Sequence, residues 1–238
     1  FYRAENGHAI GYFWGYKTAG LFQNQKEIND WIAAGNGIYQ ADVKPGDVKY
    51  VDVNHDGVIN ASDKVDLGNG LPKYTFGFNF NLAWKGFDLS ANFTGAAGFQ
   101  IAQSYRDPSS SQANYSRRIL KRWTGEGTSN EIPRVTYGDV GNWLFSDLYL
   151  QDGDYIRLQN LTMGYDFKKL ISWKGLSKMR LYFQVQNLFT LTKYDGMDPE
   201  IGSFNGTDGN SSDSWVSGVD MGYYPHPRTF IVGLNLAF

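Results

Sequence analysis

Apolar and polar side chains alternate along residues 72–84, PKYTFGFNFNLAW. Every even-numbered position from Tyr74 to Trp84 carries a large apolar side chain, and the odd-numbered positions between them carry Thr, Gly, Asn or Ala. A period of two over this length predicts a β-strand with one apolar face. Residues 87–97 repeat the pattern after Lys85-Gly86, so the two segments are predicted to form a tight hairpin.

Four more segments are strand candidates. Residues 179–191 and 229–238 repeat the alternation, and residues 155–167 do so with a change of phase that predicts a β-bulge near residues 159–160. Residues 11–22 are a less regular candidate. We therefore expect about six antiparallel strands of roughly 10–14 residues, which are long beside the common strand of 5–6 residues.

Two all-β architectures accommodate such strands. A soluble sandwich buries the apolar face against a second sheet, whereas a transmembrane barrel turns that face to lipid and needs strands of about 9–11 residues. The polar face here is built from Asn, Thr, Ser, Gln and Gly, which suits a water-filled lumen, and the apolar face ends in aromatic residues. These features favour the barrel. The amides expected to hydrate its lumen are those of Asn79, Asn81, Asn92, Gln184 and Gln186.

The connections between the strands are of two lengths. Short turns are expected at residues 85–86 and 173–178, and long connections at residues 23–71, 100–153 and 193–228. Long loops of outer-membrane barrels are extracellular, which would place the C-terminal Phe238 on the periplasmic side. Because a membrane barrel has at least about eight strands, we expect further strands from sequence outside this chain or from other copies of it.

Composition narrows the possible functions. The chain of 238 residues has a net charge of −2, so it lacks the basic excess of a nucleic-acid-binding protein, and it has no cysteine for disulfides or thiolate chemistry. Aromatic residues make up 16% of the chain, in keeping with β structure. It has three His and neither a G-x-S-x-G nor an H-E-x-x-H motif. An extracellular hydrolase is therefore disfavoured, and we interpret the chain as not being an enzyme.

Residues 52–63, DVNHDGVINASD, carry oxygen ligands at the spacing of a calcium-binding loop. Counted from the first Asp, side-chain oxygens fall at positions one, three and five, a glycine at six, a backbone carbonyl at seven and a carboxylate at twelve. The alternative is an Asx-rich turn without an ion. We favour a structural Ca²⁺ that orders a long loop with little hydrophobic core of its own. The predicted ligands are Asp52, Asn54, Asp56, Val58 and Asp63.

Seven segments carry a family resemblance. They are IGYFWGYKTAGLFQNQKEI, KPGDVKYVDVNHDGVINASDKVDLGNGLPKYTFGFN, KGFDLSANFTGAAG, RWTGEGTSNEIPR, YIRLQNLTMGYDF, LYFQVQNLFTLTKYDGMDPE and YPHPRTFIVGLNLAF. In this order, over essentially the whole chain, they resemble the C-terminal part of SusC-like (RagA-like) TonB-dependent transporters. The resemblance implies a barrel of about 22 strands. Residues 1–238 would supply about the last six strands, with the plug domain and the earlier strands outside this chain.

The resemblance also implies a function: TonB-dependent active import of an oligomeric nutrient, a glycan or a peptide, across the bacterial outer membrane. The implied partners are a SusD-like surface lipoprotein, TonB acting through an N-terminal region outside this chain, outer-membrane lipid, and an oligosaccharide or peptide ligand. A passive porin or surface adhesin is the alternative, because its wall would look the same. Loop aromatics that could stack on a sugar or pack the loops together are Trp143, Tyr149, Trp215, Tyr223 and Tyr224.

Overall fold

The chain folds into two compact units, each gathered from segments that are far apart in the sequence. The computed structural model describes residues 1–104, 116–136, 141–171, 173–201 and 217–238. Unit 1 consists of Phe1–Gly70, Ile101–Gln151 and Gly202–Gly222. Unit 2 consists of Leu71–Gln100, Asp152–Ile201 and Tyr223–Phe238.

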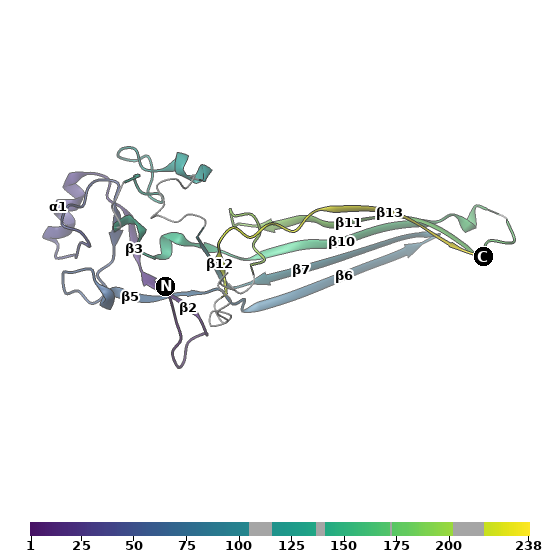
Figure 1. Ribbon diagram of the computed structural model, residues 1–238, viewed down its shortest axis with the longest axis horizontal. Coiled ribbons are helices and arrows are strands. Elements are labelled where there is room, and N and C mark those ends of the chain that lie inside the picture. The colour runs from purple at the N-terminus through teal and green to yellow at the C-terminus, as the bar shows by residue number, and fades with distance from the viewer. Residues whose placement is uncertain (105–115, 137–140, 172, 202–216) are drawn as a thin grey trace. The chain divides into compact units, whose positions relative to one another are not determined.

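Unit 2 contains one antiparallel sheet of five long strands. In chain order these are β6 (Tyr74–Trp84), β7 (Phe87–Ala97), β10 (Tyr155–Asp166), β11 (Lys178–Thr192) and β13 (Thr229–Ala237). They lie side by side in the order β13-β11-β10-β7-β6 (Figure 1). Five of the six expected strands are thus confirmed, and so is their antiparallel pairing.

The hairpin and the bulge expected from the sequence are both present. Lys85 and Gly86 connect β6 to β7 with φ angles of 47° and 96°, the two positive values that a type I′ turn requires. In β10 the pairing with both neighbours shifts between Leu158 and Asn160. Against β7, where the partners Phe93 and Asn92 are adjacent, Gln159 is the extra residue of the bulge. Against β11 the extra residue lies in β11, between Phe189 and Gln186. This irregularity brings the two halves of β10 into the same phase.

One face of the sheet is a continuous apolar surface. Phe78 of β6 lies opposite Phe93 of β7, which in turn lies opposite Leu158 of β10. Many large side chains on this face are exposed, for example Phe78 at 59% and Val232 at 73%. Because they are exposed, no second sheet of the described residues covers this face, which argues against a soluble sandwich.

The opposite face of the sheet is polar. Asn79, Asn92 and Asn160 lie opposite one another on β6, β7 and β10, and Asn160 also lies opposite Gln186 of β11. The side chain of Gln184 donates a hydrogen bond to Oδ1 of Asn160 at 3.4 Å. The strand register places on this face all five amides predicted for it, Asn79, Asn81, Asn92, Gln184 and Gln186.

An ion pair crosses a whole strand on the polar face. Gly164 of β10 lies between Asp88 of β7 and Tyr182 of β11. Arg180 Nε and Nη2 donate to the two carboxylate oxygens of Asp88 at 2.8 and 2.5 Å. A Cβ atom at position 164 would lie 2.6 Å from the guanidinium group. The absence of a side chain at Gly164 therefore leaves the space through which Arg180 reaches Asp88.

The remaining elements lie wholly or mainly in unit 1, apart from the short helix η5 (Phe167–Lys169) between β10 and β11. They form three small sheets, β1-β2-β5, β3-β4 and β12-β8-β9. The strands and α-helix are β1 (Tyr2–Arg3), β2 (Tyr12–Tyr16), β3 (Thr18–Leu21), α1 (Gln25–Ala33), β4 (Val48–Tyr50), β5 (Lys64–Asn69), β8 (Gln100–Gln103), β9 (Leu150–Asp152) and β12 (Val219–Asp220). The 3₁₀ turns are η1 (Ala61–Asp63), η2 (Arg117–Lys121), η3 (Gly141–Trp143) and η4 (Asp147–Tyr149). No helix in the described ranges is long and apolar enough to cross a membrane.

Two expectations for unit 1 are wrong. Residues 11–22 do not add a sixth long strand, because β2 and β3 belong to two separate small sheets. The long connection at residues 23–71 was expected to have little hydrophobic core, but it forms one by packing against β2 and β3. The buried side chains of this cluster are Tyr16, Leu21, Val48, Tyr50 and Ile59. Their contacts join segments distant in sequence, which local alternation does not reveal.

Replacing Gly164 by Val should break the Arg180–Asp88 pair, because the new side chain would occupy the path of the guanidinium group. We expect a loss of about 2 kcal/mol in the free energy of unfolding, the scale of hydrogen bonds to charged groups. Gly77→Val is the matched control, because its Cβ would meet only the carbonyl oxygen of Phe93, at an ordinary 3.7 Å. Urea unfolding of the intact protein measures both variants. Equal stability of the two would contradict this explanation.

Candidate functional site

The loop at residues 52–63 is held together by its own carboxylates. Asp52 is 3% exposed and Asp63 is fully buried. Asp52 accepts the N–H of Gly57 at 2.7 Å, and Asp63 accepts the N–H groups of Val53 and Asn60 at 2.9 and 2.8 Å. Burial alone would raise the pKa of Asp52, but the N–H groups that it accepts, that of Gly57 first, hold this pKa below its ordinary value.

The predicted calcium ligands share this loop without meeting at one point. Asn54, Asp56 and Val58 are exposed. Among the described residues, a different trio is the one whose carboxylate and imidazole atoms all lie within 4.8 Å of one another. A cation would therefore have to draw the oxygens of Asp52, Asp56 and Asp63 together. The donors are the hard oxygens that Ca²⁺ prefers, and the calcium assignment stays a prediction.

The trio that does meet is Asp198, Glu200 and His226, which lie in unit 2. The buried guanidinium group of Arg157 donates to Asp198 at 2.5 Å and to Glu200 at 2.8 Å. The backbone N–H of His226 donates to Asp198 at 3.1 Å, and the ring nitrogen Nδ1 lies at the same distance from it. The guanidinium group of Arg157 already supplies a positive charge between these carboxylates, so a metal ion is not needed to neutralise them. Arg157, Asp198, Glu200 and His226 are here called the rim cluster, and we interpret it as a structural ion-pair network.

A buried carboxylate also organises unit 1. Asp47 is 1% exposed and accepts hydrogen bonds from Arg134 Nε at 2.6 Å and Nη2 at 3.0 Å. It also accepts one from Asn142 Nδ2 at 2.8 Å, while Asn142 Oδ1 accepts the N–H of Val48 at 2.9 Å. Asp47 thereby fixes Arg134 and Asn142, two residues that border a pocket.

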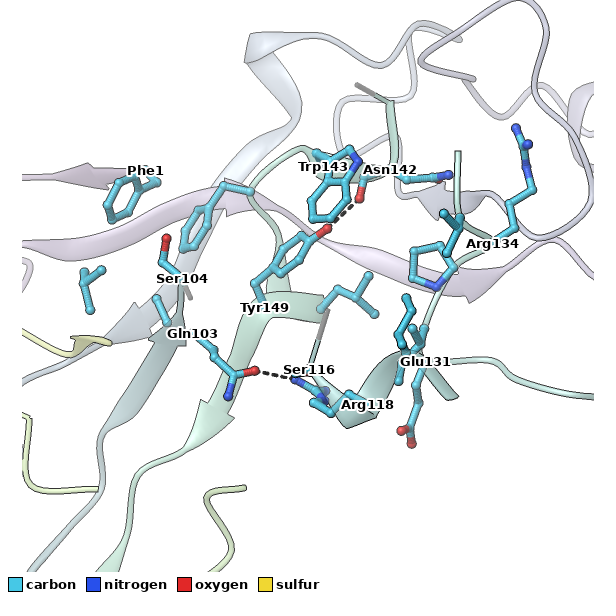
Figure 2. Close-up of a pocket in the computed structure, with 18 residues that line it drawn as sticks. Phe1, Gln103, Ser104, Ser116, Arg118, Glu131, Arg134, Asn142, Trp143 and Tyr149 are labelled. Carbon is cyan, nitrogen blue, oxygen red and sulfur yellow. Dashed lines mark hydrogen bonds between the residues drawn. The ribbon is translucent and has the colours of Figure 1, made fainter. Parts of the chain in front are cut away.

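This pocket, with a volume of about 300 Å³, lies within unit 1 (Figure 2). The rings of Trp143 and Tyr149 stack in its wall with centroids 6.4 Å apart, and those of Phe1 and Phe145 approach to 5.1 Å. The Tyr149 hydroxyl donates to the carbonyl of Asn142 at 2.6 Å. Burial raises the pKa of Tyr149, so this hydroxyl stays neutral. The volume and the aromatic lining are those of a small ligand site.

The sequence identified part of this pocket. Trp143 and Tyr149 were among the candidate loop aromatics, and the structure stacks them on each other. Tyr223 and Tyr224 belong to unit 2, and Trp215 lies outside the described residues. Phe1 and Phe145 could not be found from the sequence, because no local pattern links positions so far apart.

Known proteins are similar in sequence to this chain. The chain is 34% identical over 234 residues to TonB-dependent receptor P3 of Formosa agariphila, covering 98% of this chain and 22% of the relative. It is 29% identical over 205 residues to TonB-dependent receptor SusC of Bacteroides thetaiotaomicron, covering 84% of this chain and 18% of the relative. The chain thus spans about a fifth of the length of these relatives. No protein-family model matches it.

The fold is shared with solved structures as well. The RagAB peptide importer in its "open-open" state aligns with a TM-score of 0.63 at 20% identity, over 100% of this chain and 24% of the importer chain. This likeness confirms that the fold is that of part of a large β-barrel. Together with the named relatives it confirms the resemblance to SusC-like receptors. The relatives are receptors, so the interpretation of the chain as a non-enzyme is confirmed too.

Acid should release the segment at residues 193–201 from the rim cluster. Burial opposes ionisation of Asp198, but the N–H groups of Glu200 and His226, the His226 ring and Arg157 lower its pKa below 3.8. A lowered folded-state pKa means that the stabilisation is fully present above about pH 3.8 and is lost as the pH falls through the folded value.

Hydrogen exchange of residues 193–201, corrected for intrinsic rates, should therefore rise steeply between pH 5 and pH 2, a window set by the lowered pKa of Asp198. Asp198→Asn should already show fast exchange at pH 5, and the exposed Lys193→Gln, in the same segment, should behave as the unmodified protein. Slow exchange in Asp198→Asn at pH 5 would contradict the role given to this carboxylate.

Proposed function

We propose that this chain, which is homologous to part of the SusC-like TonB-dependent receptors, forms a section of the wall and loops of an outer-membrane importer. The observation that carries the proposal is the five-stranded sheet of unit 2. Its strands are long and antiparallel, its apolar face is exposed, and its other face is lined by amides. A sheet with these two faces suits a barrel that meets lipid outside and water inside.

The dimensions of the sheet support a membrane location. β6 has 11 residues, β11 has 15 and β13 has 9, which meets the need of about 9–11 tilted residues for crossing the hydrocarbon layer. Tyr74 and Trp84, at the two ends of β6, are 70% and 66% exposed, as the aromatic girdles of such barrels require. Within the described residues β6 and β13 are edge strands, and further strands would close the barrel.

The proposed activity is TonB-dependent import of an oligomeric nutrient, a glycan or a peptide. The names of the relatives and the fold shared with the RagAB peptide importer support it. In this proposal unit 1 is the extracellular part, and a SusD-like lipoprotein binds on that side. TonB acts through regions of the receptor that lie outside this chain.

Uptake in living cells tests the import function. Labelled oligosaccharides and peptides of about six units are offered to a strain with the intact receptor, and to strains that lack the receptor, TonB or the neighbouring lipoprotein. We expect accumulation of at least one label to fall more than about tenfold in each deletion strain, because binding without energy coupling does not concentrate a cargo. Undiminished uptake without TonB would identify a passive porin, and surface binding without any uptake would identify an adhesin.

We also propose that a structural Ca²⁺ binds the loop at residues 52–63. The ligand spacing supports this, and so does Gly57, whose φ of 82° provides the sharp turn. Each buried carboxylate oxygen that accepts one N–H keeps a second lone pair for an ion. Because Ile59 of this loop is already part of a hydrophobic core, the ion would stiffen the loop and would not be needed to fold it.

Asp56→Asn is the variant that tests the calcium proposal. Asp56 is exposed, and Asn can keep the turn in which its side chain accepts the N–H of Val58 at 2.9 Å. We expect the affinity for Ca²⁺, measured by calorimetry on the purified receptor, to fall at least about tenfold with the loss of one charged ligand. Asp42→Asn, at an exposed position outside the loop, is the control. Identical calcium binding by the two variants, or none in the unmodified receptor, would refute the site.

A further inference from the structure

The pocket of unit 1 has an apolar interior that belongs to the packed core around it. On one side, Phe145 packs against the buried cluster of Phe13, Ala102 and Val219. On another, Leu148 packs against the cluster that contains Val48 and Tyr50. Phe145, Leu148, Ala102 and Val219 all line the pocket. Walls that are continuous with the core are fixed before any ligand arrives, which is typical of specific binding sites.

The charged side chains that border the pocket are directed away from its interior or bound by other residues. Arg134 points away from the Trp143–Tyr149 stack (Figure 2). Its guanidinium group is bound by Asp47. Glu131 also directs its carboxylate away from the stack (Figure 2). Arg118 Nη1 donates to Gln103 at 2.8 Å. The interior is therefore left to aromatic and aliphatic surface.

Such an interior discriminates between the two classes of cargo. A sugar ring carries several hydroxyl groups, and each one buried without a partner loses its hydrogen bonds to water and weakens binding. The apolar side chain of a peptide leaves no polar group unpaired there.

The rim of the pocket suits the rest of a peptide. Ser104 and Ser116 are exposed and offer hydroxyl groups beside the apolar interior. Main-chain N–H and C=O groups of an extended peptide need such partners on either side of an inserted side chain. We infer that this pocket binds one large apolar side chain of a peptide cargo. The inference rests on the proposed import function and chooses between its two cargo classes.

Narrowing the pocket from its exposed rim tests the inference. Ser116→Trp places a large ring at a lining position that is exposed to solvent. Leu120→Trp, on the same short helix η2 at a position 76% exposed and outside the lining, is the matched control. The purified full-length receptor with its lipoprotein is titrated with three probes. These are a Gly/Ser hexapeptide with one central Phe, the same peptide with Ser in place of Phe, and maltohexaose.

The unmodified complex should bind the Phe peptide at least about tenfold more tightly than the Ser peptide, the scale expected for burying one aromatic side chain. Ser116→Trp should abolish this difference and Leu120→Trp should keep it. Equal affinity for the two peptides, or binding of maltohexaose that Ser116→Trp weakens, would overturn the inference. TonB-dependent uptake of an oligosaccharide alone would refute the peptide assignment while leaving the import function intact.

Discussion

The pleat of the β-strand is the constraint on which the rest of this structure depends. A strand sends successive side chains to opposite faces, so a sheet can separate two solvents only if all its strands keep the same phase. Here the phase is kept on the apolar face by Phe78 of β6, Phe93 of β7 and Leu158 of β10, and Val185 of β11 and Phe230 of β13 continue it. Asn79, Asn92 and Asn160 keep it on the polar face. A small residue also contributes to this arrangement, because Gly164 leaves space for the Arg180–Asp88 ion pair on the polar face.

In the irregular segments outside the long strands, buried carboxylates hold the chain in place. Asp47 joins Arg134 and Asn142, and Asp63 closes its own loop through two backbone N–H groups. Asp198 binds an arginine, a histidine ring and two backbone N–H groups. Irregular segments leave many backbone N–H groups without ladder partners, and an ionised carboxylate satisfies several at once. Unit 1 adds hydrophobic clusters to these ties, so its loops hold their shape as a packed body.

The features that could be predicted from the sequence are those that depend on neighbouring residues, and the features that could not are those that depend on contacts between distant residues. The strands of unit 2, the turn at Lys85-Gly86 and the bulge at Gln159 were predictable, because alternation and turn chemistry are local. The pocket of unit 1 was not, because its walls bring together Phe1, Phe145 and residues from two core clusters. The failed strand at residues 11–22 has the same cause, since Tyr12 and Phe13 have strand chemistry but are buried in unit 1.

The bulge at Gln159 has a consequence for how this strand can vary in length. Elsewhere in β10, adding or removing one residue would move every side chain beyond that point to the opposite face of the sheet. Leu161 would then lie on the polar face, or Arg157 on the apolar face. On the β11 side, residues 187 and 188 already lie between the partners of Leu158 and Asn160. On the β7 side these partners, Phe93 and Asn92, are adjacent, so removal of Gln159 would make that pairing regular and leave both halves of β10 facing as they do now. Gaps of a single residue in alignments of related barrels should therefore be tolerated at this point, while the flanking positions keep a constant spacing.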